Sequence, residues 1–322
     1  MSEFDIIRRY FKRSAKHAVL GIGDDAALVT PSSKLEFAIS TDTLVCGKHF
    51  FADVDPYKLG YKSLAVNLSD MAAMGAKPRW ALLALTLPDD LVKHHKTWLN
   101  RFSKGFFALA DLHQVELIGG DTTSGPLNIG VQIIGEVTEG KALRRSGAQL
   151  NDDIWVSGQL GDAALAIKHE LQQITLESNE IAQCLPALLM PTARVGLGQR
   201  LIGLAHSAID ISDGLMADLE HILVASEKAA CIYMVDIPSS PILKKYWQQS
   251  LAIRCLLAGG DDYELCFTAP RINREKIEAL SLELSIPLTR IGEILSGEGL
   301  IVKDTQGNAI TLETKGYDHF SA

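Results

Sequence analysis

The sequence predicts an α/β protein of two domains, each built around a mixed β-sheet. The chain has 322 residues, which is about two domains of ~150 residues. Short runs of apolar and β-branched residues alternate with longer stretches of helical periodicity, the pattern of α/β units. Several of the apolar runs end in Asp-containing clusters. We therefore expect domains at 1–140 and 141–322, with functional residues at strand ends.

The composition is that of an ordinary globular protein with a large core. Hydrophobic residues make up 47% of the chain, charged residues make up 22%, and the formal net charge is −8. No Lys/Arg run stands out, and no apolar run reaches the roughly 20 residues of a membrane span. The five cysteines are far apart and form no C-x-x-C pair. We expect a cytoplasmic protein in a reducing compartment, with no nucleic-acid or membrane partner.

The first domain is predicted to begin with a short amphipathic helix and to continue as strands and helices. Strands are expected at 19–22, 26–29, 38–43, 80–87, 115–118 and 127–137, and helices at 55–75 and 89–112. The first two strands flank Gly21-Ile-Gly-Asp-Asp-Ala26, which formally fits a dinucleotide-binding pattern. Two carboxylates there would repel a pyrophosphate unless metal ions stood between them, so a metal-bridged phosphate site fits better.

The second domain repeats the alternation of strands and helices. Strands are expected at 153–157, 208–211, 231–235, 265–268, 288–294 and 300–302. Helices are expected at 163–171, 179–189, 191–204, 215–229, 241–249 and 273–284. Ser212, which directly follows a predicted strand, is the natural N-cap of the helix over 215–229.

Acidic clusters recur along the chain at the ends of apolar runs. They are Gly23-Asp24-Asp25, Ser40-Thr41-Asp42, Leu68-Ser69-Asp70, Gly119-Gly120-Asp121, Asp210-Ile-Ser-Asp213 and Gly259-Gly260-Asp261-Asp262. One such cluster alone is usually a turn or a helix cap. Two carboxylates about 4 Å apart repel by roughly 4 kcal/mol at an effective dielectric of 20, so clusters that converge require cations.

The ligand types favour magnesium and phosphoryl transfer. Oxygen ligands suit Mg²⁺, whose usual partner is a polyphosphate. The sequence contains no H-E-x-x-H, no G-x-S-x-G and no paired Cys ligands, so zinc and acyl-transfer chemistry have no support. In phosphoryl transfer the protein mainly positions and neutralises charge, and it needs no nucleophilic side chain.

An ordered series of motifs resembles the thiamine-monophosphate kinase family over nearly the whole chain. The motifs are Gly21-Ile-Gly-Asp-Asp-Ala-Ala27, Ile39-Ser-Thr-Asp-Thr-Leu-Val45, Asn67-Leu-Ser-Asp-Met-Ala-Ala-Met-Gly-Ala76, Ile118-Gly-Gly-Asp-Thr-Thr123, Ile209-Asp-Ile-Ser-Asp-Gly-Leu215, Gly259-Gly-Asp-Asp-Tyr-Glu-Leu265 and Lys315-Gly-Tyr-Asp-His-Phe320. The resemblance implies the two-domain aminoimidazole ribonucleotide synthetase-like fold. Its domain 1–140 would bind ATP and Mg²⁺ and pair through its sheet in a homodimer, and the C-terminal α/β domain would follow at 141–322. It also implies direct transfer of the ATP γ-phosphoryl group to thiamine monophosphate, giving thiamine diphosphate.

The resemblance further implies roles for individual residues. Several Mg²⁺ ions would be bound by Asp25, Ser40, Thr41, Asp42, Asp70, Asp121, Asp210 and Asp213. ATP would be contacted by Gly120, Asp121, Arg145 and Ser212, and thiamine phosphate by His49, Glu264 and Tyr317. Among these residues, we expect Asp42, Asp70 and Asp121 to carry the catalytic role of holding Mg²⁺ between the nucleotide and the acceptor.

Two alternatives stay open, namely another ATP-using enzyme of the same superfamily and a non-catalytic ATP-binding maturation protein. Selenophosphate synthesis would want a reactive cysteine near the N-terminus, but the first cysteine is Cys46. The related hydrogenase maturation protein acts through a C-terminal cysteine, whereas this chain ends in His-Phe-Ser-Ala.

Overall fold

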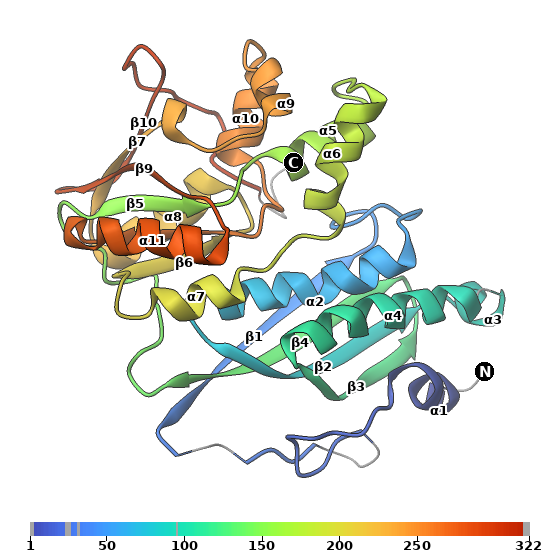
Figure 1. The fold of residues 1–322 in the computed structure, drawn as a ribbon. Helices are drawn as coiled ribbons and strands as arrows, with labels where there is room; N and C mark the ends of the chain where they lie inside the picture. Colours follow the sequence, from blue (N-terminus) through green and yellow to red (C-terminus); the bar gives the residue numbers. More distant parts are fainter. Residues whose placement is uncertain (1–2, 23–26, 31–32, 95, 318–322) are drawn as a thin grey trace. The chain divides into compact units, whose positions relative to one another are not determined.

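The chain folds into two compact units, each with its own β-sheet (Figure 1). The computed structural model describes residues 3–22, 27–30, 33–94 and 96–317. The N-terminal unit comprises Met1–Met71 and Ala76–Gly140, and the C-terminal unit comprises Ala72–Gly75 and Lys141–Ala322. In the described part of the chain, no helix is long and apolar enough to cross a bilayer.

The N-terminal unit is a four-stranded sheet with helices on one face. Its strands are β1 (Leu35–Val45), β2 (Lys77–Leu87), β3 (Glu116–Ser124) and β4 (Asn128–Thr138), in the order β1-β4-β2-β3. Strand β4 is antiparallel to β1 and β2, and β2 is parallel to β3. The helices are α1 (Glu3–Ile6), the π-helix η1 (Ile7–Phe11), α2 (Pro56–Ala73), α3 (Asp89–His94) and α4 (Lys96–His113). Helices α2 and α4 run side by side in Figure 1.

Burial along β1 shows which face of this sheet the helices cover. Ala38 and Leu44 are buried, whereas Phe37 and Ile39 are exposed. Successive side chains of a strand point to opposite faces, so β1 has one covered face and one open face. The open face carries large apolar side chains, which is unusual for a surface that meets only water.

The C-terminal unit is a six-stranded sheet packed against helices. The strands are β5 (Asp153–Ser157), β6 (Ser207–Ile211), β7 (Ala229–Tyr233), β8 (Glu264–Ala269), β9 (Leu288–Leu295) and β10 (Gly299–Lys303), in the order β10-β7-β9-β5-β8-β6. Only β10 and β7 are parallel neighbours among these described strands. The helices are α5 (Asp162–Glu170), α6 (Ser178–Leu189), α7 (Val195–Leu201), α8 (Leu215–Ser226), α9 (Pro241–Lys245), α10 (Ser250–Ala258) and α11 (Arg274–Leu284), with short 3₁₀ turns η2 (Met234–Asp236) and η3 (Arg271–Asn273). The core includes Ile154, Leu165, Leu219 and Leu256.

The predicted α/β class with mixed sheets is confirmed, and several elements differ in extent. The segment after Ile118, expected to leave the sheet, continues as β3 to Ser124 because it pairs with β2 along its whole length. Helix α8 ends at Ser226, since Glu227 adopts a left-handed conformation with φ of 54°. Helix α10 was not predicted, because its sequence has neither a clear cap nor a long amphipathic repeat.

Candidate active site

In the N-terminal unit, the structure joins two predicted site residues directly. The hydroxyl of Ser40 on β1 donates a hydrogen bond of 2.5 Å to Oδ2 of Asp70 on α2. Asp42 lies two residues after Ser40 and therefore on the same covered face of β1. Ser40 and Asp70 thus place hard oxygen atoms between the strand and the helix, and Asp42 adds a carboxylate on the same face of β1.

Thr41 lies on the open face of β1, although it stands between Ser40 and Asp42 in the sequence. Its hydroxyl donates a hydrogen bond of 3.1 Å to the carbonyl of Val131 on β4. The alternation of side chains along a strand therefore separates Thr41 from its two neighbours. Asp25, a further predicted ligand, lies outside the described residues.

The predicted ATP residues Gly120 and Asp121 lie within β3. Gly120 pairs with Leu83 and adopts a φ of 140°. A Cβ atom at this position would stand 1.9 Å from the Leu83 carbonyl oxygen, so only glycine allows the two strands to approach this closely. Asp121 pairs with Ala84, and both residues are exposed. The strand register thus places Asp121 on the open face of the sheet, opposite to the face that carries Asp42.

His49 belongs to the tight turn that follows β1. Its backbone N–H donates to the Val45 carbonyl at 3.0 Å, and its ring Nδ1 accepts from the Val45 N–H at 3.0 Å. A neutral ring that accepts at Nδ1 carries its proton on Nε2. The turn therefore holds His49 in one orientation and one tautomer.

In the C-terminal unit, several predicted residues gather at the end of β6. Asp210 is the penultimate residue of β6, and Ser212 and Asp213 follow the strand. The N–H of Asp261 donates to the Ser212 carbonyl at 2.9 Å, and the N–H of Tyr317 donates to the Asp213 carbonyl at 2.9 Å. These bonds bring the loop over 259–263 and the segment around Tyr317 to the end of β6.

The turn after β6 is held by Asp218, which sequence reasoning missed. Its Oδ2 accepts the backbone N–H groups of Ser212, Asp213 and Gly214 at 3.0, 3.1 and 3.0 Å. The predicted N-cap role of Ser212 is therefore wrong: Gly214 is the N-cap and makes no side-chain cap, because a carboxylate one turn inside α8 takes the free amides. Its position in Asp213-Gly-Leu-Met-Ala-Asp218 was the only available signal.

Carboxylates crowd this turn. Asp218 is buried, and burial followed by the charges of Asp210 and Asp213 raises the pKa of Asp218 to about 7. The backbone hydrogen bonds act in the opposite direction and do not overcome this. An arrangement of this kind favours the approach of a cation or of a proton.

Glu264, the first residue of β8, is locked into an ion pair. It is buried and pairs in register with Ile211 of β6. Arg194 binds it in a bidentate manner: Nε donates to Oε2 at 2.6 Å and Nη2 donates to Oε1. Ser157 Oγ also donates to Glu264 and accepts the N–H of Leu265 at 2.9 Å. Glu264 thus has a single orientation.

The surroundings of this ion pair are built to accept it. Gly158 has a φ of 60°, and a Cβ atom there would stand 1.9 Å from Oε1 of Glu264. Burial of the guanidinium opposes its charge, but the hydrogen bonds and the charge of Glu264 outweigh this and raise the pKa of Arg194. Arg194 was not singled out from the sequence, because an arginine before a helix has no distinctive pattern.

Arg145 lies apart from the end of β6. The carbonyl of the preceding residue, Arg144, accepts the N–H of Ala208 at 3.0 Å, near the start of β6. The carbonyl of Arg145 accepts the hydroxyl of Ser226 at 3.2 Å, at the end of α8. Arg145 is exposed. Within this unit the structure therefore keeps the backbone of Arg145 at the opposite end of the strand from Ser212.

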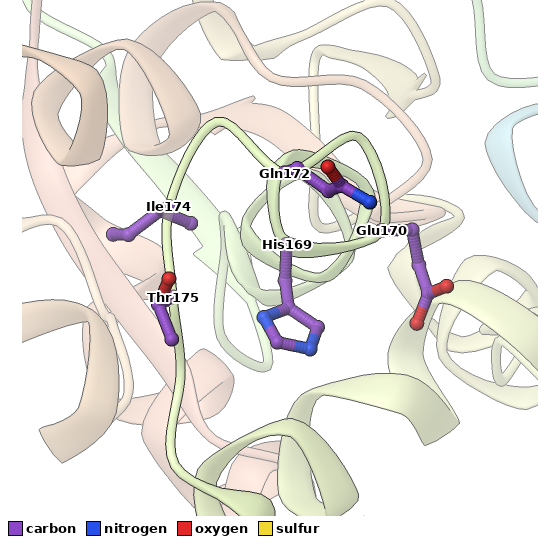
Figure 2. Close-up of a pocket in the computed structure, with 5 residues that line it drawn as sticks. All are labelled: His169, Glu170, Gln172, Ile174 and Thr175. Carbon is purple, nitrogen blue, oxygen red and sulfur yellow. The ribbon is translucent and has the colours of Figure 1, made fainter.

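A cavity of about 280 Å³ lies at the end of α5 in the C-terminal unit. Figure 2 shows its lining side chains, which are His169, Glu170, Gln172, Ile174 and Thr175. Nδ1 of His169 accepts the N–H of Leu176 at 3.1 Å, so the ring is held by the loop that follows α5. None of the predicted site residues that the structure describes lines this cavity.

Among the described residues, His, Cys, Asp and Glu side chains alone do not complete a metal centre. Across residues 3–22, 27–30, 33–94 and 96–317, no three His, Cys, Asp or Glu side chains are placed so that they could hold a metal ion. The oxygen-rich pairs and the crowded carboxylates described above do match the ligand type that Mg²⁺ prefers. Mg²⁺ is commonly bound by one or two carboxylates together with substrate phosphates and water.

Comparisons with known proteins identify relatives over the full length of the chain. The family model "AIR synthase related protein, N-terminal domain" matches residues 23–137. The thiamine-monophosphate kinase of Escherichia coli (strain K12) is 47% identical over 326 residues, which cover 99% of this chain and 98% of that protein.

Two solved structures have the same fold. The crystal structure of thiamine-monophosphate kinase from Stenotrophomonas maltophilia K279a has a TM-score of 0.84 and 46% identity, covering 95% of this chain and 96% of the other. A structure described as "AaThiL complexed with AMPPCP and TMP" has a TM-score of 0.78 and 30% identity, covering 90% and 89%. The expected aminoimidazole ribonucleotide synthetase-like fold and the family resemblance are thereby confirmed, and the chain belongs to the thiamine-monophosphate kinase family.

Proposed function

We propose that this chain transfers the γ-phosphoryl group of ATP to the phosphate of thiamine monophosphate, giving thiamine diphosphate. The observation that carries this proposal is 47% identity with a thiamine-monophosphate kinase over essentially the whole of both chains. The fold neighbour complexed with AMPPCP, an ATP analogue, and TMP supports ATP and thiamine monophosphate as the two substrates.

The chemistry requires positioning and charge neutralisation more than acid-base catalysis. The acceptor is a phosphate group that is already an anion at neutral pH, so no side chain has to remove a proton from it. The protein must instead bring two anionic groups into line and offset their repulsion. This agrees with a candidate site that is rich in oxygen ligands and contains no activated nucleophile among the residues assigned to it.

The residues proposed to hold Mg²⁺ are Asp25, Ser40, Thr41, Asp42, Asp70, Asp121, Asp210 and Asp213. The close Ser40–Asp70 pair and the crowding of Asp210 and Asp213 around Asp218 support a cation near each. Bound Mg²⁺ would neutralise phosphate charge and orient the transferred group. Because the Thr41 hydroxyl donates to the Val131 carbonyl, we propose that Thr41 contributes its backbone carbonyl oxygen.

Substrate contacts are proposed for the remaining residues. Gly120, Asp121, Arg145 and Ser212 would contact ATP, and His49, Glu264 and Tyr317 would contact thiamine phosphate. The fixed tautomer of His49, with a proton on Nε2, supports a role as a hydrogen-bond donor to an oxyanion. The bond from Tyr317 to Asp213 supports a place for Tyr317 beside the end of β6.

We further propose a homodimer that pairs through the N-terminal sheet, with residues 1–140 binding ATP and Mg²⁺. The exposed Phe37 and Ile39, 37% and 58% accessible, support an apolar partner for the open face of β1. The five free thiols, most of them buried, support a reducing, cytoplasmic setting.

The proposed activity is tested by ³¹P NMR of the purified chain with ATP, Mg²⁺ and thiamine monophosphate. The expected result is a new pair of diphosphate resonances that grows in step with ADP. Intact ATP, or hydrolysis of ATP without loss of thiamine monophosphate, would contradict the proposal and leave the open alternatives of another ATP-using enzyme or an ATP-binding protein.

A further inference from the structure

Glu264 presents a problem for a site that receives a phosphate monoester. Its carboxylate is buried at the start of β8, one strand from the predicted metal and nucleotide residues Asp210 and Ser212. A bare carboxylate in such a place would repel an incoming anion, and the low effective dielectric would strengthen the repulsion. The structure removes this difficulty through Arg194.

We propose that Arg194 is a positioning residue that sets the charge of the acceptor site: by cancelling the charge of Glu264, it makes the site prefer the phosphate-bearing thiamine monophosphate over thiamine. This inference rests on the proposed function. Arg194 acts through Glu264, and its own contact with the substrate is not required.

The geometry of the pair supports this role. Arg194 engages both carboxylate oxygens, which is the strongest arrangement that an arginine and a carboxylate can form. Ser157 donates a further hydrogen bond, and the lack of a Cβ atom at Gly158 leaves space for the carboxylate. Because the side chain of Arg194 is 18% exposed and that of Glu264 is 8% exposed, solvent screens the pair weakly.

The helix that directly follows Arg194, α7, supplies a matched control. Arg200 on α7 binds Glu283 with both nitrogens at 2.5 and 2.7 Å, but these side chains are 51% and 55% exposed. Arg200 and Glu283 therefore repeat the chemistry of the Arg194–Glu264 pair on an open surface. A substitution there controls for the loss of one arginine–glutamate pair near α7.

The test compares binding of thiamine monophosphate and of thiamine, a cation without the phosphate. Isothermal titration calorimetry on the full-length protein gives the ratio of the two affinities. Arg194→Gln should lower the preference for thiamine monophosphate by about tenfold, because Glu264 becomes an uncompensated anion. Glu264→Gln should raise the preference, and the double variant Arg194→Gln/Glu264→Gln should return it to within about threefold of the wild type. Arg200→Gln should leave it unchanged.

The directions in which the affinity ratio changes among these variants separate a charge-setting role of Arg194 from a merely structural one. A structural defect would weaken both ligands together and would leave the ratio unchanged, which would overturn the inference. A double variant as impaired as Arg194→Gln would also overturn it, since restoring neutrality would then have no effect. If Arg194→Gln does not fold, Glu264→Gln and the double variant still decide the result. A wild-type protein that phosphorylates thiamine monophosphate but lacks this pattern refutes the inference alone, whereas an inactive wild type refutes the proposed function.

Discussion

Ser40 on β1 and Asp70 on α2, 30 positions apart in the sequence, are joined by a hydrogen bond of 2.5 Å. The bond ties the carboxylate of Asp70 to the strand that also carries Asp42. Because the hydroxyl donates its proton to Oδ2, it holds the Asp70 carboxylate in place without neutralising the negative charge that attracts a cation. Ser40 therefore helps to fix the direction in which Asp70 presents its carboxylate.

Replacing Ser40 should impair the use of Mg²⁺ more than the fold. In Ser40→Ala, Asp70 loses a hydrogen bond that orients it, so we expect the Mg²⁺ concentration for half-maximal activity to rise by about fivefold to tenfold. Titration of initial rates with Mg²⁺ at saturating ATP measures this. Thr41→Val is the control, because the Thr41 hydroxyl lies on the other face and binds the Val131 carbonyl. An equal effect of the two substitutions would contradict the orienting role of Ser40.

Asp42→Asn should abolish turnover while the protein remains folded. The amide keeps the shape of the carboxylate but lacks the charge that would hold Mg²⁺ against the phosphates, so we expect kcat to fall by at least about a thousandfold. Coupled measurement of ADP release checks this, with the thermal midpoint as the folding readout. Asp111→Asn, which breaks the exposed pair with Arg13, is the matched control. Near-normal kcat in Asp42→Asn would exclude the assigned role.

Asp218→Ala should loosen the turn that carries Ser212 and Asp213. Three backbone N–H groups lose their acceptor, which we expect to cost about 2–4 kcal/mol of unfolding free energy. Removal of this carboxylate also removes its repulsion from Asp210 and Asp213 and offsets part of the loss. Urea unfolding measures the net change. The backbone amides of this turn should also exchange their hydrogens faster in Asp218→Ala than in the wild type. Equal exchange rates in the two proteins would contradict the capping role.

Glu180 should contribute to the loss of folding stability at acid pH. Lys245, the N–H of Glu177 and the hydroxyl of Tyr246 hydrogen-bond to Glu180 and lower its pKa from 4.5 to about 2. A carboxyl group whose pKa is lower in the folded than in the unfolded state stabilises the fold above its unfolded pKa. This contribution is lost as the pH falls from about 4.5 toward about 2. The thermal midpoint of Glu180→Gln should therefore lie below that of the wild type at pH 7, and the gap should narrow as the pH falls through this range. A difference in thermal midpoint that does not change with pH would contradict the assignment. As a control, Glu298→Gln at an exposed position should have the same thermal midpoint as the wild type at every pH.

The sequence predicted the strands and helices well where periodicity and punctuation agreed, as at Asp153–Ser157, which forms β5. It predicted Glu264 as a site residue but not its partner Arg194, because the pairing joins the start of β8 to the residue before α7 and no local pattern records that contact. It also grouped Ser40, Thr41 and Asp42 as one ligand cluster. Side-chain alternation along β1 divides that cluster between two faces, and this could have been anticipated once the segment was assigned as a strand.

Gly120→Ala should disrupt the edge of the N-terminal sheet. The added Cβ would meet the Leu83 carbonyl oxygen at 1.9 Å, and φ of 140° is unfavourable for any residue with a side chain. Relief requires the strands β2 and β3 to separate at the residue before Asp121, so we expect a loss of about 3 kcal/mol or more in unfolding free energy together with weaker ATP binding. Chemical denaturation and calorimetry with ATP measure the two effects. Gly196→Ala is the control, since Gly196 lies in α7 and a Cβ added there would point into open space. Alanine at this position should be neutral or stabilise by about 0.5–1 kcal/mol. If Gly120→Ala were as stable as this control, the close approach of β2 and β3 would not be what demands glycine at this position.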